Sequence, residues 1–327
     1  MNNARRNALT PEALAMVDAI ARSGSFAAAA RELGKVPSAL TYSVRQLEDA
    51  LDVLLFDRSS RQARLTAAGV ELLEHGRRVL GAVDALANRV QRVATGWEAS
   101  LTIAADGVVS RLTLFELVES FYAERGAGAS TQLRLRTEVL TGVWEALVSG
   151  HADLAIGLSG DTGGHVGIEV RALGEMSFVF AVAPHHPLAG RPEPLADDEI
   201  QRHRAVAVAD SAQRLAPATH NLLGGQDVFT VSSMQAKIEA QVRCLGCGFI
   251  PEPLARTHIR NGVLVVKRVQ RGNPLARMSY AWRADAVGQP QKAPQGLALQ
   301  WWLRQLDSST TRQALLESHH HVMADVD

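Results

Sequence analysis

The sequence contains no apolar run approaching the roughly 18 residues that a helix needs to span a bilayer. Its first residues, MNNARRNALTPEA, include no apolar stretch that could act as a signal peptide. It also lacks a glycine-rich phosphate loop, an HExxH motif and a GxSxG motif. We therefore expect a cytoplasmic protein with no enzymatic activity and no cofactor.

Cysteine is scarce, because Cys244 and Cys247 are the only two in the chain. A four-thiolate zinc site is therefore excluded, and no metal site is expected. Their CxxC spacing leaves redox sensing open, but packing as small apolar side chains is the favoured interpretation. The three histidines at 319–321 are interpreted as part of a disordered tail.

The chain has no net charge, since 34 basic residues balance 34 acidic ones. Residues 1–96, however, carry 13 Lys and Arg against 10 Asp and Glu, while the remainder carries 21 against 24. This asymmetry permits nucleic-acid binding at the N-terminal end without requiring it. The length of 327 residues predicts two or three domains.

Two short helices are predicted near the N-terminus. Thr10 followed by Pro11 is a helix-start signal, and Gly24 suits the left-handed cap at the end of that helix. Ser25 then caps an alanine-rich second helix over residues 26–33.

A third helix is predicted from Ser38, its expected cap, to about Leu51. Apolar residues recur along one side of it at spacings of four and three: Leu40, Val44, Leu47 and Leu51. Polar residues form another side: Ser38, Thr41, Tyr42, Arg45 and Asp49. Two helices, a tight turn and an amphipathic third helix are typical of a helix-turn-helix, whose polar side faces the DNA major groove. For this helix in isolation, a solvated face would be the better interpretation.

The segment after the third helix, LLFDRSSRQARLT, favours DNA binding. It places three arginines between apolar anchors, as in a two-stranded wing that reaches phosphates or the minor groove. The expected DNA-binding residues are Ser25, Ser38, Thr41, Tyr42, Arg45, Arg58, Arg61 and Arg64.

These N-terminal motifs, taken in order, resemble the DNA-binding domain of LysR-type transcriptional regulators. The matching residues are Ser25-Phe26, Ala29-Ala30, Leu47-Glu48, Leu55-Phe56-Asp57-Arg58 and Leu65-Thr66-Ala67-Ala68-Gly69. The chain departs from the family at Pro37 and at Thr41-Tyr42, where members often carry Gln and a Ser-Arg pair. Because tyrosine cannot make the bidentate contact of arginine to guanine, the DNA sequence that is read should differ.

A long helix is predicted over residues 67–95. Apolar side chains recur along it with a period of 3.5 over three heptads, at Leu72, Gly76, Val79, Val83, Leu86, Val90 and Val93. The other faces are largely charged, so the stripe should pair with the same helix of a second subunit. A helix buried against its own domain is the alternative. The resemblance implies dimers through this helix, and commonly tetramers.

From Trp97 onward, strand-like and helix-like segments alternate, which predicts an α/β fold with a mainly parallel sheet. This part, which includes His186-Pro187-Leu188-Ala189, resembles the effector domain of the same family, similar in fold to periplasmic binding proteins. The expected fold is thus α/β with an all-α, winged N-terminal part. The predicted divisions are a winged helix-turn-helix (1–66), a linker helix (67–96), a two-lobed effector domain (97–306) and a C-terminal tail (307–327). Lobe I would comprise about 97–170 and 277–306, and lobe II about 171–276.

The resemblance implies an effector pocket between the lobes, outside strand ends and near helix N-termini. The residues carried over are Asp106, Gly107, Val108, Thr141, Gly142, Asp210, Ser211, Gly248 and Phe249. Thr141 is the preferred contact to a carboxylate, although a role as helix cap is nearly as well supported. Asp106 would repel an acid unless protonated or paired, which favours a neutral, phenolic or cationic effector. The tryptophans at 282, 301 and 302 are expected to pin the last helix to lobe I rather than to form an aromatic site.

The leading hypothesis is therefore a dimeric or tetrameric regulator that binds promoter DNA and responds to a small molecule. RNA polymerase is a further candidate partner. The competing hypothesis is a small-molecule binding protein or enzyme whose N-terminal helices only dimerise it.

Overall fold

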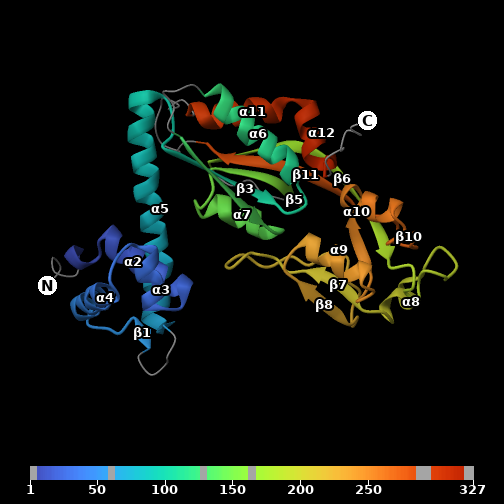
Figure 1. Cartoon of the computed structure of the whole chain (residues 1–327), viewed down its shortest axis with the longest axis horizontal. Coiled ribbons are helices and arrows are strands. Elements are labelled where there is room, and N and C mark those ends of the chain that lie inside the picture. The colour runs from blue at the N-terminus through green and yellow to red at the C-terminus, as the bar shows by residue number, and fades with distance from the viewer. Residues whose placement is uncertain (1–5, 58–62, 126–130, 161–166, 285–295, 320–327) are drawn as a thin grey trace, which may run out of the picture. The chain divides into compact units, whose positions relative to one another are not determined.

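The computed structural model describes residues 6–57, 63–125, 131–160, 167–284 and 296–319. Four residues with predicted roles, Arg58, Arg61, His320 and His321, lie outside these ranges. The chain forms two compact units, residues 1–91 and 92–327 (Figure 1).

The N-terminal unit begins with the helices α2 (Pro11–Ser23), α3 (Phe26–Glu32) and α4 (Pro37–Leu51). The hydroxyl of Thr10 accepts a hydrogen bond from the Ala13 N–H at 3.2 Å, and Gly24 ends α2 with a φ of 63°. The hydroxyl of Ser25 accepts a hydrogen bond from the Ala28 N–H at 3.4 Å. The predicted caps of the first two helices are thus confirmed.

The predicted cap of the third helix is wrong. Helix α4 begins at Pro37, and its N-cap position is Val36, which makes no side-chain capping bond. Proline lacks an N–H and has a φ near that of a helix, so it suits the first helical position. Ser38 therefore lies inside the first turn with its side chain exposed.

The apolar side of α4 packs into one core with α2 and α3. Leu40, Val44 and Leu47 are buried in this core, together with Ala29 and Ala30 of α3, which are fully buried. Alanine at those two positions lets the neighbouring helices approach closely. The helix-turn-helix arrangement expected from the sequence is therefore present.

The wing is a pair of short antiparallel strands, β1 (Phe56–Asp57) and β2 (Arg64–Leu65). The buried carboxylate of Glu48 accepts hydrogen bonds from the backbone N–H groups of Leu55 at 2.8 Å and Phe56 at 3.3 Å. Glu48 thereby fixes the path of the chain from α4 into the wing.

A threonine and a glycine join the wing to helix α5 (Ala67–Thr95). The Thr66 hydroxyl donates a hydrogen bond to the Leu54 carbonyl at 2.6 Å and accepts one from the Gly69 N–H at 3.1 Å. A Cβ atom at Gly69 would lie 2.1 Å from the backbone oxygen of Leu55. Only glycine therefore permits this approach of α5 to the segment between α4 and β1.

Lobe I of the C-terminal unit is built on the strands β3 (Ser100–Asp106), β4 (Gln132–Glu138), β5 (Leu154–Ser159), β6 (Ile168–Val182) and β11 (Leu275–Arg283). Strands β4, β3 and β5 are parallel neighbours, and β11 lies antiparallel between β5 and β6. One face is covered by α6 (Arg111–Glu124), α11 (Leu297–Asp307) and α12 (Ser309–Glu317), and the other by α7 (Thr141–Val148) (Figure 1). Trp282, Trp301 and Trp302 are buried in the core beneath α11, as expected.

Lobe II continues from the second half of β6. Its further strands are β7 (Ala205–Val208), β8 (Val228–Val231), β9 (Gly248–Pro251) and β10 (Val265–Lys267), and its helices are α8 (Asp197–Gln201), α9 (Met234–Val242) and α10 (Glu252–Arg260). Strand β6 pairs with both β9 and β10, and a bridge between Ala205 and Cys247 joins β7 to this group. Strand β8 and helix α8 have no counterpart in the sequence prediction.

The predicted division between the lobes, at about residue 170, falls inside β6, which is one continuous strand of 15 residues. This strand pairs with β11 from Ile168 to Ser177, and its partners become β9 and β10 from Phe178 onward. The exchange of strand partners at Phe178 marks where β6 passes from one lobe to the other.

The segment predicted as a tail from residue 307 contains helix α12. Leu315 and Leu316 of this helix are buried, and the Leu315 carbonyl accepts a hydrogen bond from the Ser110 N–H at 2.7 Å. These two leucines bury enough apolar surface to fix a helix that is otherwise polar. Residues 309–317 are therefore part of lobe I.

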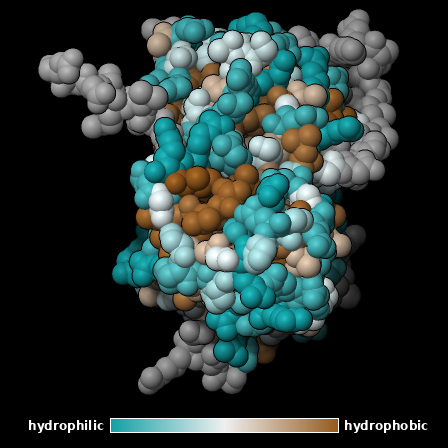
Figure 2. Space-filling model, turned by 90° about the vertical axis from the view of Figure 1, so that its right-hand side faces the viewer, coloured by the Kyte–Doolittle hydropathy of each residue, from teal (hydrophilic) through white to brown (hydrophobic). Residues whose placement is uncertain are grey.

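The surface turned toward the viewer in Figure 2 is mostly hydrophilic, with the largest hydrophobic patch in a central hollow and smaller patches above it. Within the part of the chain that the structure describes, no helix is both long and apolar enough to cross a membrane.

Candidate nucleic-acid interface and small-molecule site

The polar side of α4 is exposed along its whole length, at Ser38, Thr41, Tyr42, Arg45 and Asp49. Tyr42 is 64% exposed, and its hydroxyl accepts a hydrogen bond from the Gln46 side chain at 2.9 Å. The Thr41 hydroxyl donates a hydrogen bond to the Pro37 carbonyl at 3.0 Å. The second and third turns of α4 thus present the hydroxyl of Thr41, the ring of Tyr42 and the guanidinium of Arg45.

The remaining predicted DNA-binding residues lie outside α4, and the described ones differ in exposure. Ser25 is half-buried, and its hydroxyl is already used to cap α3. Arg64 is exposed at the start of β2, whereas Arg58 and Arg61 lie outside the described residues. Gln46, which the sequence analysis did not single out, is exposed beside Tyr42 and belongs to the same surface.

The predicted seam on α5 is only partly free. Leu72 packs against the core of the N-terminal unit, so it belongs to that domain and not to a seam. From the fourth turn onward the apolar stripe is exposed, with Val79 at 47%, Val83 at 42%, Leu86 at 59%, Val90 at 63% and Val93 at 84%. A row of large apolar side chains at such exposure indicates a surface that binds another protein.

In the predicted effector cleft, Asp106 is buried at the end of β3. Its carboxylate accepts hydrogen bonds from the N–H groups of Val108 and Leu140, each at 2.9 Å. Burial raises the pKa of Asp106 to about 6, against the effect of these two donors. Gly107 lies beside it, and its N–H donates to the Glu138 carbonyl at 3.1 Å.

A second carboxylate occupies the N-terminus of α7. Asp210 accepts hydrogen bonds from the N–H groups of Thr141 and Gly142, each at 3.1 Å, and its side chain also interacts with the Thr141 hydroxyl. The N–H groups of Ala212 and Ala218 complete its partners at 2.8 and 2.7 Å. Burial tends to raise the pKa of Asp210, but these donors hold it below its usual value.

The loop after Asp210 ties the two lobes together. The Ser211 hydroxyl accepts a hydrogen bond from the Val139 N–H at 2.9 Å and donates one to the Glu138 carboxylate at 2.8 Å. The Glu145 carboxylate of α7 accepts three backbone hydrogen bonds from the loop, donated by Gln213 at 3.1 Å, Arg214 at 2.8 Å and Leu215 at 2.9 Å. We refer to residues 210–215 as the cleft loop.

The start of α7 is therefore filled by the chain itself. A Cβ atom at Gly142 would lie 1.8 Å from the Ser211 hydroxyl oxygen, so the contact is close. Thr141 is the first residue of α7 and not its cap, because the N-cap position is Leu140. Its hydroxyl faces the protein's own carboxylate, in the position where the sequence analysis expected a ligand.

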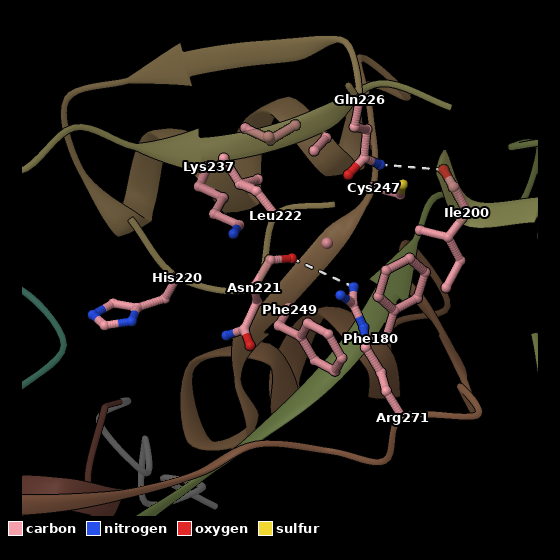
Figure 3. Close-up of a pocket in the computed structure, with 13 residues that line it drawn as sticks. Phe180, Ile200, His220, Asn221, Leu222, Gln226, Lys237, Cys247, Phe249 and Arg271 are labelled. Atoms are coloured by element: carbon pink, nitrogen blue, oxygen red, sulfur yellow. Dashed lines mark hydrogen bonds between the residues drawn. The ribbon is translucent and has the colours of Figure 1, made fainter. Parts of the chain in front are cut away.

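The two other predicted residues, Gly248 and Phe249, line a separate pocket in lobe II (Figure 3). None of the predicted residues from 106 to 211 lines it. Its most unusual member is Lys237 of α9, which is only 9% exposed. The sequence analysis missed this lysine, although a charged residue between Met234 and Ile238, on the side of α9 that faces the core, was an available signal.

Cys247 lines this pocket and supports the packing interpretation for its own thiol, whereas Cys244 is half-buried. Cys247 is fully buried, and burial raises the pKa of its thiol to about 12, so the thiol stays protonated. Cys244 ends α9 with a φ of 59°, in the left-handed region. Both thiols are free in the structure.

Two family models match the chain. Residues 11–70 match the model described as "Bacterial regulatory helix-turn-helix protein, lysR family", and residues 94–310 match the "LysR substrate binding domain". The first match ends and the second begins within α5, with residues 71–93 between them. The first covers the helix-turn-helix and wing, and the second covers both lobes.

Similar proteins extend over nearly the whole chain. The "Probable HTH-type transcriptional regulator YhaJ" of Escherichia coli strain K12 is 39% identical over 303 residues, which cover 93% of this chain and 97% of that protein. The "Uncharacterized HTH-type transcriptional regulator YeeY" of the same strain is 38% identical and covers 89% of this chain and 91% of its own. Among solved structures, full-length CbnR in complex with its target DNA aligns with a TM-score of 0.55 at 18% identity, covering 92% of this chain and 99% of that one.

Proposed function

The chain belongs to the LysR family of transcriptional regulators, and on that premise we propose that it binds promoter DNA through the exposed side of α4 and the wing. The observation that carries this proposal is the separation of faces on α4. Leu40 and Val44 anchor the helix in the core while Thr41, Tyr42 and Arg45 stand exposed on its first turns. In a helix-turn-helix, residues of those turns contact base edges. The competing hypothesis, in which the N-terminal helices only dimerise an enzyme, is set aside because the family is one of DNA-binding regulators.

We propose that the functional form is a dimer or tetramer joined through α5. The exposed stripe from Val79 to Val93 supports this, because a two-fold axis would bury the same stripe of both subunits against each other. Two recognition helices held at a fixed separation read two half-sites, which multiplies the affinity of a single domain.

The C-terminal unit is proposed to bind a small-molecule effector and to transmit its presence to the DNA-binding arms. An effector shifts the arrangement of those arms only as far as it binds one arrangement better than another. The cleft loop supports a role for the interlobe cleft, because it links lobe I to lobe II through the backbone donors of Asp210 and Glu145. A ligand that stabilises the cleft loop in its observed position, or displaces it, would bind with different affinity to two arrangements of the lobes and arms.

Location and further partners follow from the proposed role. A regulator of promoter DNA acts where that DNA lies, so we propose a cytoplasmic location. RNA polymerase is a further candidate partner, because activation of transcription would require contact with it.

An electrophoretic mobility shift with DNA from the intergenic region beside the gene tests DNA binding. Binding should weaken steeply as salt increases, because phosphate contacts release counterions. Tyr42→Ala should weaken binding to the specific site about tenfold, which is within the range for losing one good base contact. Tyr122→Ala, which removes another exposed tyrosine from α6, is the matched control and should bind normally.

Absence of binding even at low salt would refute the proposed function. An unchanged footprint for Tyr42→Ala, with the protein folded and its oligomeric state intact, would refute the assignment of the DNA-facing side of α4.

A further inference from the structure

The pocket in lobe II is very small. Phe180 of β6 and Phe249 of β9 form one wall (Figure 3). Lys237 extends from α9 toward the segment that carries Asn221 and Leu222 (Figure 3). The cavity has a volume of about 10 Å³, which is room for about one water molecule. An organic molecule is too large for this space, so its occupant is a water molecule or a monatomic ion.

Lys237 has no partner for its charge. Within the described residues its ammonium group forms neither a hydrogen bond nor an ion pair, although the residue is only 9% exposed. Lys267, the other buried lysine of lobe II, donates hydrogen bonds to the carbonyls of Ala189 at 3.0 Å and Arg191 at 2.9 Å. It also pairs with Glu193 at 3.1 Å. Burying a charge is unfavourable unless it is paired, so Lys237 is the exception that needs a reason.

The charged groups around Lys237 do not neutralise it. The described residues that line the pocket include His220 and Arg271 but no Asp or Glu. Arg271 already pairs with Asp197 at 3.4 Å. Burial raises the pKa of the Cys247 thiol to about 12, so this neighbour is neutral as well. Burial lowers the pKa of Lys237 to about 8, so the ammonium group still carries its proton at neutral pH.

The surroundings of the ammonium group strengthen its attraction for an anion. The rings of Phe180 and Phe249 lie 5.4 Å apart, and an apolar wall lowers the effective dielectric constant beside the charge. The Arg271 guanidinium lies 5.1 Å from the centre of the Phe249 ring and adds positive potential to the same space. A Cβ atom at Gly248 would lie 3.5 Å from the Lys237 Nζ, so the glycine leaves room next to the nitrogen.

Two occupants fit the size of the cavity, and their charges distinguish them. A water molecule would fill it but leave the Lys237 charge without a counter-charge. A chloride ion, which is only slightly larger than water, would fill it and pair with the ammonium group.

We propose that lobe II binds a chloride ion in this cavity, paired with the Lys237 ammonium group. The site lies apart from the residues of the cleft, because none of the predicted residues from 106 to 211 lines it. It is also independent of DNA binding, so the inference goes beyond the proposed function. Its role would be to neutralise a buried charge and thereby to stabilise lobe II.

A series of sodium salts tests the proposal on the full chain without DNA. The protein is dialysed into sodium gluconate, which is then replaced at constant ionic strength by sodium chloride, bromide or methanesulfonate. Chloride should raise Tm by roughly 5 °C and the rise should level off as the site fills, because a ligand that binds only the folded state stabilises it. Bromide should act similarly, whereas methanesulfonate, which is too large, should have less than a third of the effect.

A variant assigns the chloride effect to the lysine. Lys237→Met should weaken the chloride response at least tenfold, because it removes the only counter-charge of the ion in this cavity that has no other partner. In gluconate alone its Tm should be equal to or higher than that of the unaltered protein, because it removes an unpaired buried charge. Arg243→Met removes an exposed cation from the end of the same helix and is the control, which should keep the full chloride response.

The line width of the chloride NMR signal reports binding without reference to stability. Exchange of chloride with a protein site broadens this signal. The unaltered protein and Arg243→Met should broaden it, and added bromide should reverse the broadening by competition. Lys237→Met should broaden it much less.

Equal Tm values in chloride, methanesulfonate and gluconate would show that water alone fills the cavity and would overturn the proposal. A chloride response that is undiminished in Lys237→Met would overturn it as well. If Lys237→Met fails to fold, the salt series and the bromide competition on the unaltered protein still decide.

Discussion

Two aspartates in the cleft have opposite electrostatic properties although they lie close together. Asp106 is more deeply buried and has two backbone donors, and its pKa is raised to about 6, partly through the neighbouring Asp210. Asp210 has four backbone donors and a lowered pKa. Burial, which is much deeper at Asp106, raises its pKa above the effect of its two donors, whereas the four donors of the less buried Asp210 outweigh burial and keep its pKa low.

The raised pKa of Asp106 predicts a pH dependence of stability. Between the unfolded-state pKa near 4 and the folded-state pKa of about 6, the folded protein binds more protons at this site than the unfolded chain. This contribution to stability is therefore lost as the pH rises through 6. The Tm of the unaltered protein minus that of Asp106→Asn should therefore decrease by roughly 5 °C from pH 4 to pH 6.5. Asp227→Asn, at an exposed carboxylate, is the control whose Tm difference should not follow this pattern. An Asp106→Asn difference that is flat or increases over this range would contradict the assignment.

At the scale of elements, the junction between the wing and α5 depends on one glycine. Gly69→Ala should destabilise the N-terminal unit by about 3 kcal/mol or more, because the added methyl would overlap the Leu55 carbonyl and crowd the Leu65 side chain. Gly81→Ala, in the same helix with open space around it, should instead stabilise the unit by about 0.5–1 kcal/mol. Chemical denaturation monitored by circular dichroism measures both, and similar changes in the two variants would exclude the steric explanation.

Elements with strong local signals could be predicted from the sequence, whereas those fixed by distant contacts could not. Helix α2 has a cap at each end, and α5 has a sustained apolar period, so both were found. The lobe division was predicted inside β6 because the first half of this strand takes its place only by pairing with β11, about a hundred residues later. Helix α12 was missed because its polar composition hides the two leucines that anchor it.

The candidate sites show the same division. The exposed side of α4 follows from helical spacing alone, and it was identified except for Gln46. The residues of the cleft were also found, but not that Asp210 and Glu145 bind backbone donors from the opposite lobe, because no local pattern encodes a contact between residues so far apart in the sequence. Lys237 was missed because its significance depends on the lack of a nearby acid, which only the folded chain reveals.

At the scale of the whole molecule, the exposed stripe on α5 predicts the oligomeric state. Introducing charges with Leu86→Glu together with Val90→Glu should dissociate the dimer, raising its dissociation constant at least a hundredfold, because both side chains would be buried in the paired helices. Sedimentation velocity measures the change. Asp84→Ala, an exposed position off the stripe, is the control and should remain dimeric. A double variant that sediments like the unaltered protein would place the interface elsewhere.

Because Asp210 already occupies the start of α7, any free acid that enters the cleft needs a higher affinity to bind there. A carboxylate attached to the chain is present at its site at an effective concentration in the millimolar range, whatever the composition of the cell. A free acid must compete with Asp210 for the amides of Thr141 and Gly142. Its apparent affinity is therefore reduced in proportion to the fraction of molecules in which Asp210 leaves these amides free. The chain thus acts as its own competitive inhibitor at that position. A free ligand binds there only if it displaces the Asp210 carboxylate from these amides, or if it uses other contacts in the cleft.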